Sequence, residues 1–456
     1  MNTTPHAVTT TAEIDSAIRG PLLTYTGDPY QHGLDRTMVY EADALVAMSG
    51  GRIACCGPAA QVIPQLPAGL RIEDYGRDSL ILPGFIDCHV HYPQTEIIAG
   101  YGVQLIDWLE KYAFVAERRF ADASYARSVA RAFLRESIAN GVTTACVYCT
   151  VHPQSVDAFF EEAGPLGARM IAGKVLMDRN APPELCDTAQ RAYDESRALI
   201  EKWHGRGRLM YAITPRFAVT SSEEQLAAAG TLRREFPDCF LQSHISENRG
   251  EVAWVRELFP QRKGYLDVYD HFGLLGRRAI YGHGIWLSEN EIQRCHDTGT
   301  AIAHCPTSNF FLGSGCLDVA KLATPGRPVR VGLATDLGGG TSFSFLRTMG
   351  AAYQAAQMSG SSLSPGHAFY LATRGTARAL YLEDKIGSVA PGMEADLVVL
   401  DMKSTPIIEF RMRHARDLAE ALFIQMIMGD ERAVRATYVG GQRLYLKTDD
   451  PLQAAV

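Results

Sequence analysis

The chain has 456 residues, of which 46% are hydrophobic and 21% are charged, and its formal net charge is -7. This composition is typical of a globular protein with a large core and excludes disorder along the whole length. The acidic balance and the lack of a long basic run argue against nucleic acid as a partner.

The cysteines and the apolar segments indicate a cytoplasmic protein. Ten cysteines are scattered along the chain, and the one C-x-x-C pair, Cys146 and Cys149, has no second pair to complete a zinc knuckle. The polar, Thr-rich start predicts no secretory signal, and no apolar run reaches the length of a membrane span. We therefore expect reduced thiols and no membrane partner.

The two ends of the chain show the same β texture. Residues 44–48 are apolar, a Ser-Gly-Gly-Arg turn follows, and residues 53–55 are apolar again, which predicts a hairpin. Near the other end, apolar residues 396–401 and 436–439 flank a helical stretch. Residues 1–82 and 386–456, the latter with a terminal helix, are therefore predicted to form one small β domain.

Between these ends, residues 83–385 alternate short apolar strands with amphipathic helical segments such as 125–139. This βα rhythm is typical of a parallel sheet. The eight strand candidates are residues 85–88, 144–148, 170–175, 209–213, 240–243, 279–281, 301–303 and 329–335. The sequence therefore predicts an α/β fold with a (β/α)8 TIM-like barrel, whose active site lies at the carboxyl ends of the strands.

His89 and His91 follow the first strand candidate of this barrel. Residues two apart on an extended chain project to the same side, so both imidazoles are able to reach one metal ion. Taken alone, the pair is equally compatible with a structural role.

Three later strand candidates end in His244, His283 and Asp336. Each has a structural reading: a core hydrogen bond, a brace between strands, or a helix cap. Together with His89 and His91 they favour a metal site, because imidazole nitrogen and carboxylate oxygen are ligands for Zn²⁺.

Glu247 lies three residues after His244, where a carboxylate is able to move protons between water, substrate and leaving amine. Without a metal site it would be read as an exposed loop residue.

The run PGFIDCHVHYPQT at residues 83–95 resembles the first-strand signature of the amidohydrolase superfamily. Its YPQT tail resembles the guanine deaminase family in particular. Further similar runs are ERRF at 117–120, TPRF at 214–217 and SHISEN at 243–248. The resemblance extends from about residue 20 to residue 445.

This resemblance implies one zinc ion per chain, a homodimer, and a purine base as the small-molecule substrate. The implied zinc ligands are His89, His91, His244 and Asp336. Glu247 would be the proton shuttle, and His283 and Asp336 would orient the catalytic water. Lys174, which bridges two metals in some relatives after carboxylation, is interpreted as structural.

The implied reaction is hydrolysis of guanine to xanthine and ammonia, a step of purine breakdown or salvage. Arg216 offers a rigid donor fork that matches the O6 and N7 acceptors of guanine, and Gln94 is placed to pair with the ring edge. Adenine presents an amino donor in place of O6 and is expected to be rejected. Phe217 is either a wall of the pocket or a core residue.

Two other functions stay open at this level. One is a related ring hydrolase acting on 8-oxoguanine, cytosine, a pterin or a triazine. The other is a non-catalytic scaffold that has lost its metal, although the retained ligands argue against it. His304 and the cysteines near strand ends (Cys88, Cys146 and Cys149) are interpreted as structural residues rather than ligands.

Overall fold

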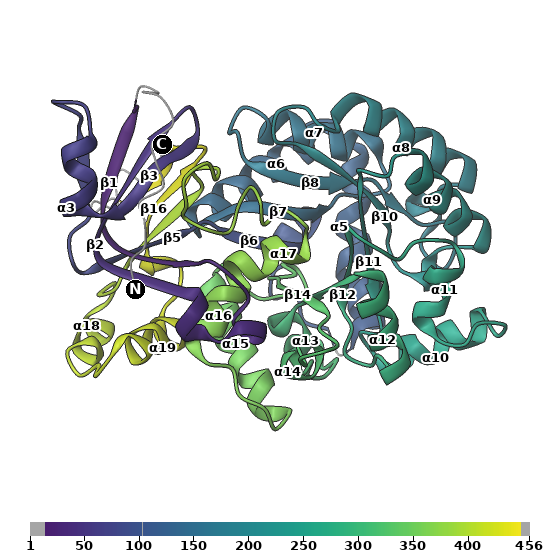
Figure 1. The fold of residues 1–456 in the computed structure, drawn as a ribbon. Helices are drawn as coiled ribbons and strands as arrows, with labels where there is room; N and C mark the ends of the chain where they lie inside the picture. Colours follow the sequence, from purple (N-terminus) through teal and green to yellow (C-terminus); the bar gives the residue numbers. More distant parts are fainter. Residues whose placement is uncertain (1–13, 103, 448–456) are drawn as a thin grey trace.

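The computed structural model describes residues 14–102 and 104–447. Two sheets organise these residues: a parallel barrel that is ringed by helices, and a smaller sheet built from both ends of the chain (Figure 1). The predicted fold class, a (β/α)8 barrel with a small β domain, is confirmed by this arrangement. The predicted domain boundaries at residues 82/83 and 385/386 stay predictions.

The barrel strands pair in parallel in the order β14-β13-β12-β11-β10-β8-β7-β6, with the short β9 beside β10. Their residues are almost all buried, as expected where side chains fill the barrel and helices cover its outside. The strands are β6 (Phe85–His91), β7 (Val142–Tyr148), β8 (Arg169–Gly173), β9 (Val175–Leu176), β10 (Met210–Pro215), β11 (Phe240–Ile245), β12 (Ala279–His283), β13 (Ala301–His304) and β14 (Arg330–Leu333).

The last strand meets the first through a few direct contacts. The N–H of Asp336 donates to the carbonyl of His89 at 3.0 Å. The Asp87 carboxylate accepts the N–H of Thr335 at 3.1 Å and also the Thr335 hydroxyl. The carboxyl ends of β6 and β14 are thereby held together, which places the residues that follow each strand at one end of the barrel.

Helices connect the barrel strands and cover the sheet (Figure 1). Helix α6 starts at an Asp122 N-cap and buries one face, including Phe133 and Ile138, against the barrel, as its apolar spacing predicts. The main helices of the barrel are α6 (Ala123–Ala139), α7 (Pro153–Ala163), α8 (Ala189–Trp203), α9 (Glu223–Glu235), α10 (Arg249–Leu258), α11 (Tyr265–His271), α12 (Glu289–Thr298), α13 (Pro306–Phe311), α15 (Phe345–Met358), α16 (Pro365–Tyr370) and α17 (Thr376–Ala379).

A helical insertion follows β6 and covers the carboxyl end of the barrel. It begins with η2 (Tyr92–Ile97) and continues through α4 (Leu105–Trp108) and the π-helical turn η3 (Leu109–Ala113) to α5 (Phe114–Arg118). Buried residues from three of these segments, Gln94, Trp108 and Glu117, face the barrel end.

The smaller sheet has the order β17-β16-β15-β5-β1-β2-β3, with β4 beside β1. Strands from the two chain ends meet where β15 pairs with β5. The helices α18 (Pro406–Met412) and α19 (Leu418–Met428) lie between β15 and β16. The strands are β1 (Ser16–Tyr25), β2 (Met38–Ser49), β3 (Arg52–Pro58), β4 (Ile72–Asp74), β5 (Ser79–Pro83), β15 (Leu397–Asp401), β16 (Val434–Val439) and β17 (Gln442–Leu446).

The predicted single strand at residues 170–175 is divided at Lys174 into β8 and β9. The Thr-rich start lies outside the described residues, as do residues 448–456 of the segment predicted to hold a terminal helix. Among the helices that the structure describes, none combines the length and apolar character needed to cross a membrane.

Candidate metal centre and active site

Four side chains from three strands converge at the carboxyl end of the barrel. His89 and His91 come from β6, His244 from β11 and Asp336 follows β14. The Nε2 atoms of His91 and His244 lie 3.1 Å apart. Asp336 Oδ1 lies 3.5 Å from His89 Nε2 and 3.6 Å from His91 Nε2. The structure therefore brings together all four residues that the sequence proposes as ligands.

These separations fit one tetrahedral metal ion. Zinc–ligand bonds of about 2.0–2.1 Å give tetrahedral ligand–ligand edges of about 3.3 Å, close to the observed separations. The Nε2 of His89 is buried and has no hydrogen-bond partner among the described residues, as expected of a ligand atom. Burial lowers the pKa of His89, His91 and His244 well below the usual value, so the imidazoles are neutral and able to coordinate.

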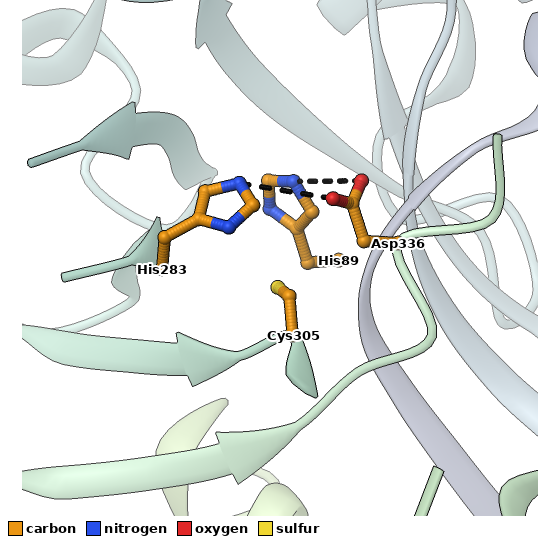
Figure 2. A group of neighbouring side chains, drawn as sticks. All are labelled: His89, His283, Cys305 and Asp336. Carbon is orange, nitrogen blue, oxygen red and sulfur yellow. Dashed lines mark ion pairs between the residues drawn. The ribbon is translucent and has the colours of Figure 1, made fainter. Parts of the chain in front are cut away.

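Two histidines have their tautomers fixed by oxygen acceptors. The Nδ1–H of His244 donates to the carbonyl of Arg216 at 2.7 Å, which leaves the Nε2 lone pair free for a metal. The Nδ1–H of His283 donates to Asn309 Oδ1 at 2.8 Å, and its Nε2 lies 3.3 Å from Glu247 Oε2 and 3.7 Å from Asp336 Oδ2. His283 is thus oriented toward both carboxyl groups, and Figure 2 shows its side with Asp336.

Glu247 is a buried carboxyl group with a raised pKa. Burial, followed by the negative charge of Asp336, raises the pKa of Glu247 to about 8. The Ser314 hydroxyl donates to Glu247 Oε1 at 3.1 Å, and the backbone N–H of Glu247 donates to Glu251 at 2.8 Å.

The backbone at the site adopts conformations that non-glycine residues rarely take. Ser246, His283 and Asp336 have φ angles of 48°, 71° and 47°. Such left-handed conformations persist only where the surrounding structure enforces them, and they concentrate at functional sites. On β12, Gly282 packs against the His89 ring so closely that a Cβ there would lie 2.4 Å from His89 Cε1.

The proposed recognition residues line the same pocket as the metal-binding side chains. Arg216 and Phe217 follow β10, Gln94 lies in η2, and all three are buried. Phe217 approaches the His244 ring edge-on, with centroids 6.4 Å apart. The pocket is lined by His91, Gln94, Leu105, Trp108, Leu109, Arg216, Phe217, His244, Glu247, His283, Leu312, Asp336 and Gly339.

Two residues that contact the pocket lining were given no role by the sequence analysis. Glu117 contacts Arg216 and Gln94, and Asn309 holds His283. Both lie on helical segments rather than at strand ends, so the strand pattern gives no indication of them. Their only signals in the sequence are that Glu117 begins the run ERRF, which resembles the family, and that Asn309 lies five residues after His304.

Other residues that the sequence raised as possible ligands have structural surroundings. The ammonium group of Lys174 is buried in ion pairs with Asp187 and Glu195. His304 is buried and belongs to neither cluster of potential metal ligands at the barrel end. Burial lowers the pKa of its imidazole to about 3.

One thiol lies closer to the metal-binding side chains. Cys305 Sγ is near His89, His283 and Asp336, below the two ion pairs drawn in Figure 2. It donates to the Ala303 carbonyl at 3.4 Å, and burial followed by the charge of Asp336 raises its pKa. Because its thiol is directed to the Ala303 carbonyl, we describe Cys305 as packing beside the site.

Comparison with known proteins gives consistent matches. The model of the amidohydrolase family matches residues 80–444. Guanine deaminase from Escherichia coli (strain K12) is 47% identical over 403 residues, which cover 88% of this chain and 91% of that protein. The solved E. coli guanine deaminase matches with a TM-score of 0.92 and 45% identity over 95% of this chain and 100% of that chain. A guanine deaminase from C. acetobutylicum with guanine bound in its active site matches with a TM-score of 0.82 and 29% identity, over 94% of this chain and 100% of that one.

Proposed function

The chain belongs to the amidohydrolase family, and from this we propose that it hydrolyses guanine to xanthine and ammonia with one zinc ion per chain. The observation that carries the proposal is the placement of two groups in one pocket. The candidate metal ligands His91, His244 and Asp336 line it together with Glu247, and so do the candidate recognition residues Arg216 and Gln94. The choice of guanine as the substrate is supported by the similarity of this chain to guanine deaminases in sequence and fold.

His89, His91, His244 and Asp336 would hold the zinc ion. A zinc ion held there lowers the pKa of water enough to supply a hydroxide nucleophile near neutral pH. Asp336 and His283 face the same space, and their oxygen and nitrogen atoms are placed to orient the attacking water.

Glu247 moves the protons of the reaction. The reaction adds water at C2 of guanine, the carbon that bears the amino group, and breaks the bond from C2 to that nitrogen. Glu247 delivers a proton to ring N3 as the C2–O bond forms, and then carries the proton of the attacking water to the departing amine. The bond to nitrogen breaks, ammonia leaves, and xanthine remains. Burial raises the pKa of Glu247, which suits a carboxyl group that must both accept and donate a proton.

Arg216 recognises the face of the purine away from the metal. Its guanidinium group is buried in the pocket, where a donor that remains unpaired is costly. Guanine satisfies it with the acceptors O6 and N7, whereas adenine presents an amino donor to it. Gln94 pairs with the ring edge and Phe217 forms a wall, which together select a 6-oxopurine.

We further propose that the enzyme works in the cytoplasm as a homodimer. All ten cysteines are free thiols, in keeping with a reducing compartment. On α18, Ile407 and Phe410 are 61% and 58% exposed, and neighbouring apolar side chains of this size favour an interface. Light scattering of the purified protein tests the assembly: a single-chain mass would contradict it.

A substrate panel tests the proposed reaction. We expect the zinc-loaded protein to release ammonia from guanine and to leave adenine and cytosine essentially unreacted. Preferred release from 8-oxoguanine, cytosine, a pterin or a triazine would instead assign a related ring hydrolase. No release from any substrate by protein with full zinc content would contradict the function.

A further inference from the structure

Glu117 on α5 is a buried carboxylate that contacts both proposed recognition residues. Arg216 Nη1 donates to its two oxygens, at 2.9 Å to Oε1 and 2.7 Å to Oε2. Gln94 Nε2 donates to the same Oε1 at 3.2 Å. Glu117 is 0% exposed and Arg216 is 2% exposed, so this contact is shielded from water. Charge attraction in such surroundings is far stronger than at a protein surface.

The ion pair between Glu117 and Arg216 compensates the positive charge that Arg216 would otherwise bring to the pocket. An isolated buried guanidinium group would favour an anionic ligand, because a ligand charge would then be its only compensation. Because Glu117 accepts from Nη1 alone, the other N–H groups of Arg216 stay available as donors, while the guanidinium charge is compensated. Among the described residues, these two oxygens are the only side-chain acceptors of the Arg216 guanidinium group.

Glu117 also sets the orientation of the Gln94 amide. Because the carboxylate accepts from Nε2, the amide oxygen points away from Glu117, toward Gly338. The fit is close: a Cβ on Gly338 would lie 2.2 Å from Gln94 Oε1. One carboxylate therefore fixes the direction of a donor and of an acceptor that line the pocket.

We infer that Glu117 is a positioning residue that makes the pocket selective for a neutral purine and weakens its hold on an anionic product. The inference rests on the proposed reaction, since xanthine, with its second carbonyl group, is a stronger acid than guanine. Besides the histidines, the ionisable groups that line the pocket are Arg216, Asp336 and Glu247, and Glu117 contacts Arg216. Loss of the Glu117 charge would leave Arg216 to pair with the xanthine anion.

Ligand binding to the zinc-loaded protein tests this inference without turnover. Calorimetry compares xanthine with hypoxanthine at a mildly alkaline pH, where xanthine is mostly an anion and hypoxanthine is mostly neutral. For Glu117→Gln we expect the affinity for xanthine relative to hypoxanthine to rise roughly tenfold or more. For Arg216→Gln, which leaves Glu117 uncompensated, we expect the same ratio to fall.

In the double variant Glu117→Gln/Arg216→Gln, the affinity for xanthine relative to hypoxanthine should lie close to that of the unaltered protein, because both charges are then absent. Glu110→Gln, a change at an exposed carboxylate in the neighbouring turn η3, is the matched control and should leave the ratio unchanged.

Equal changes for both ligands in the single variants would overturn the inference and leave Glu117 with a packing role only. If Glu117→Gln does not fold, the sign of the change in Arg216→Gln decides: a ratio that does not fall contradicts charge compensation. Failure of the proposed reaction is seen separately, as absence of ammonia release from guanine by the unaltered protein.

Discussion

At the scale of single residues, the site depends on which nitrogen of each imidazole is free. The Arg216 carbonyl accepts a hydrogen bond from Nδ1 of His244, and Asn309 Oδ1 accepts one from Nδ1 of His283. Both Nε2 atoms therefore turn toward the pocket. The same backbone segment that supplies a carbonyl to a metal-binding histidine also carries the guanidinium group of Arg216. In the proposed function, metal binding and purine recognition would therefore share one short loop after β10.

Glu247→Gln should separate proton transfer from metal binding. The substitution keeps the size of the side chain and removes the group that takes and gives protons, so we expect ammonia release from guanine to fall by a factor on the order of 10² to 10⁴. Zinc content, measured by elemental analysis, should stay at the level of the unaltered protein. Full activity in the variant would remove Glu247 from the mechanism.

The sequence predicted the residues at strand ends better than those on helices. His89, His91, His244, His283 and Asp336 are recognisable because each follows a short apolar strand, and parallel strands bring their ends together. Glu117 and Asn309 have no such pattern, because their roles depend on how helical segments fold back over the barrel. The predicted roles of Gln94, Arg216 and Phe217 still await a substrate test.

At the scale of elements, the strands hold the ligands in place through close backbone packing. β12 passes the His89 ring at Gly282, where a Cβ would lie 2.4 Å from Cε1 and 2.8 Å from Nδ1 of that imidazole. Strand positions were predicted to within a few residues, since continuous apolar runs identify buried parallel strands. The division of one predicted strand at Lys174 was not, because it follows from a buried ion pair with Asp187.

Gly282→Ala should weaken metal binding without touching a ligand. The added methyl group must push the His89 ring aside, so we expect zinc affinity to fall by about tenfold or more. Competition with a chromophoric chelator measures this. Gly250→Ala on α10 is the control, because its added methyl group meets only Asn248 Oδ1, at 3.2 Å. Equal zinc affinities in the two variants would show that the His89 ring adapts to β12.

At the scale of the whole molecule, buried ion pairs join the barrel to the small sheet. Glu394, just before β15, accepts from Arg169 Nε of β8 at 3.0 Å and lies 2.7 Å from Arg208 Nη2. Arg208 also pairs with Asp396. The pairing of β15 with β5 confirms the prediction that both chain ends form one β unit. The ion pairs between the barrel and the small sheet were not indicated by the sequence, because the paired residues lie far apart along the chain.

Glu394→Ala should destabilise the fold by about 3 kcal/mol, because it leaves the buried guanidinium group of Arg169 without its carboxylate partner and removes one of the two partners of the partly buried Arg208. Urea unfolding at neutral pH measures the change. Glu409→Ala, which removes an exposed carboxylate paired with Arg413 on α18, should have little effect. A small loss of stability in Glu394→Ala would mean that water replaces the ion pair.

The same carboxylate gives a pH dependence of known sign. Burial alone would raise the pKa of Glu394, but Arg169 and Arg208 outweigh it and hold the pKa below the usual 4.5. Its contribution to stability is therefore present above pH 4.5 and lost as the pH falls through the folded value. In Glu394→Gln, the free energy of unfolding should fall less steeply below that pH than in the unaltered protein, whereas parallel profiles would contradict the assignment.

Titration of metal-free protein with zinc, followed by ammonia release from guanine, tests the central claim most directly. Four side chains that form one tetrahedral set predict no activity before zinc is added and a linear rise that stops at one zinc per chain. Guanine turnover that persists without any metal, or a rise that continues to two ions per chain, would contradict the account.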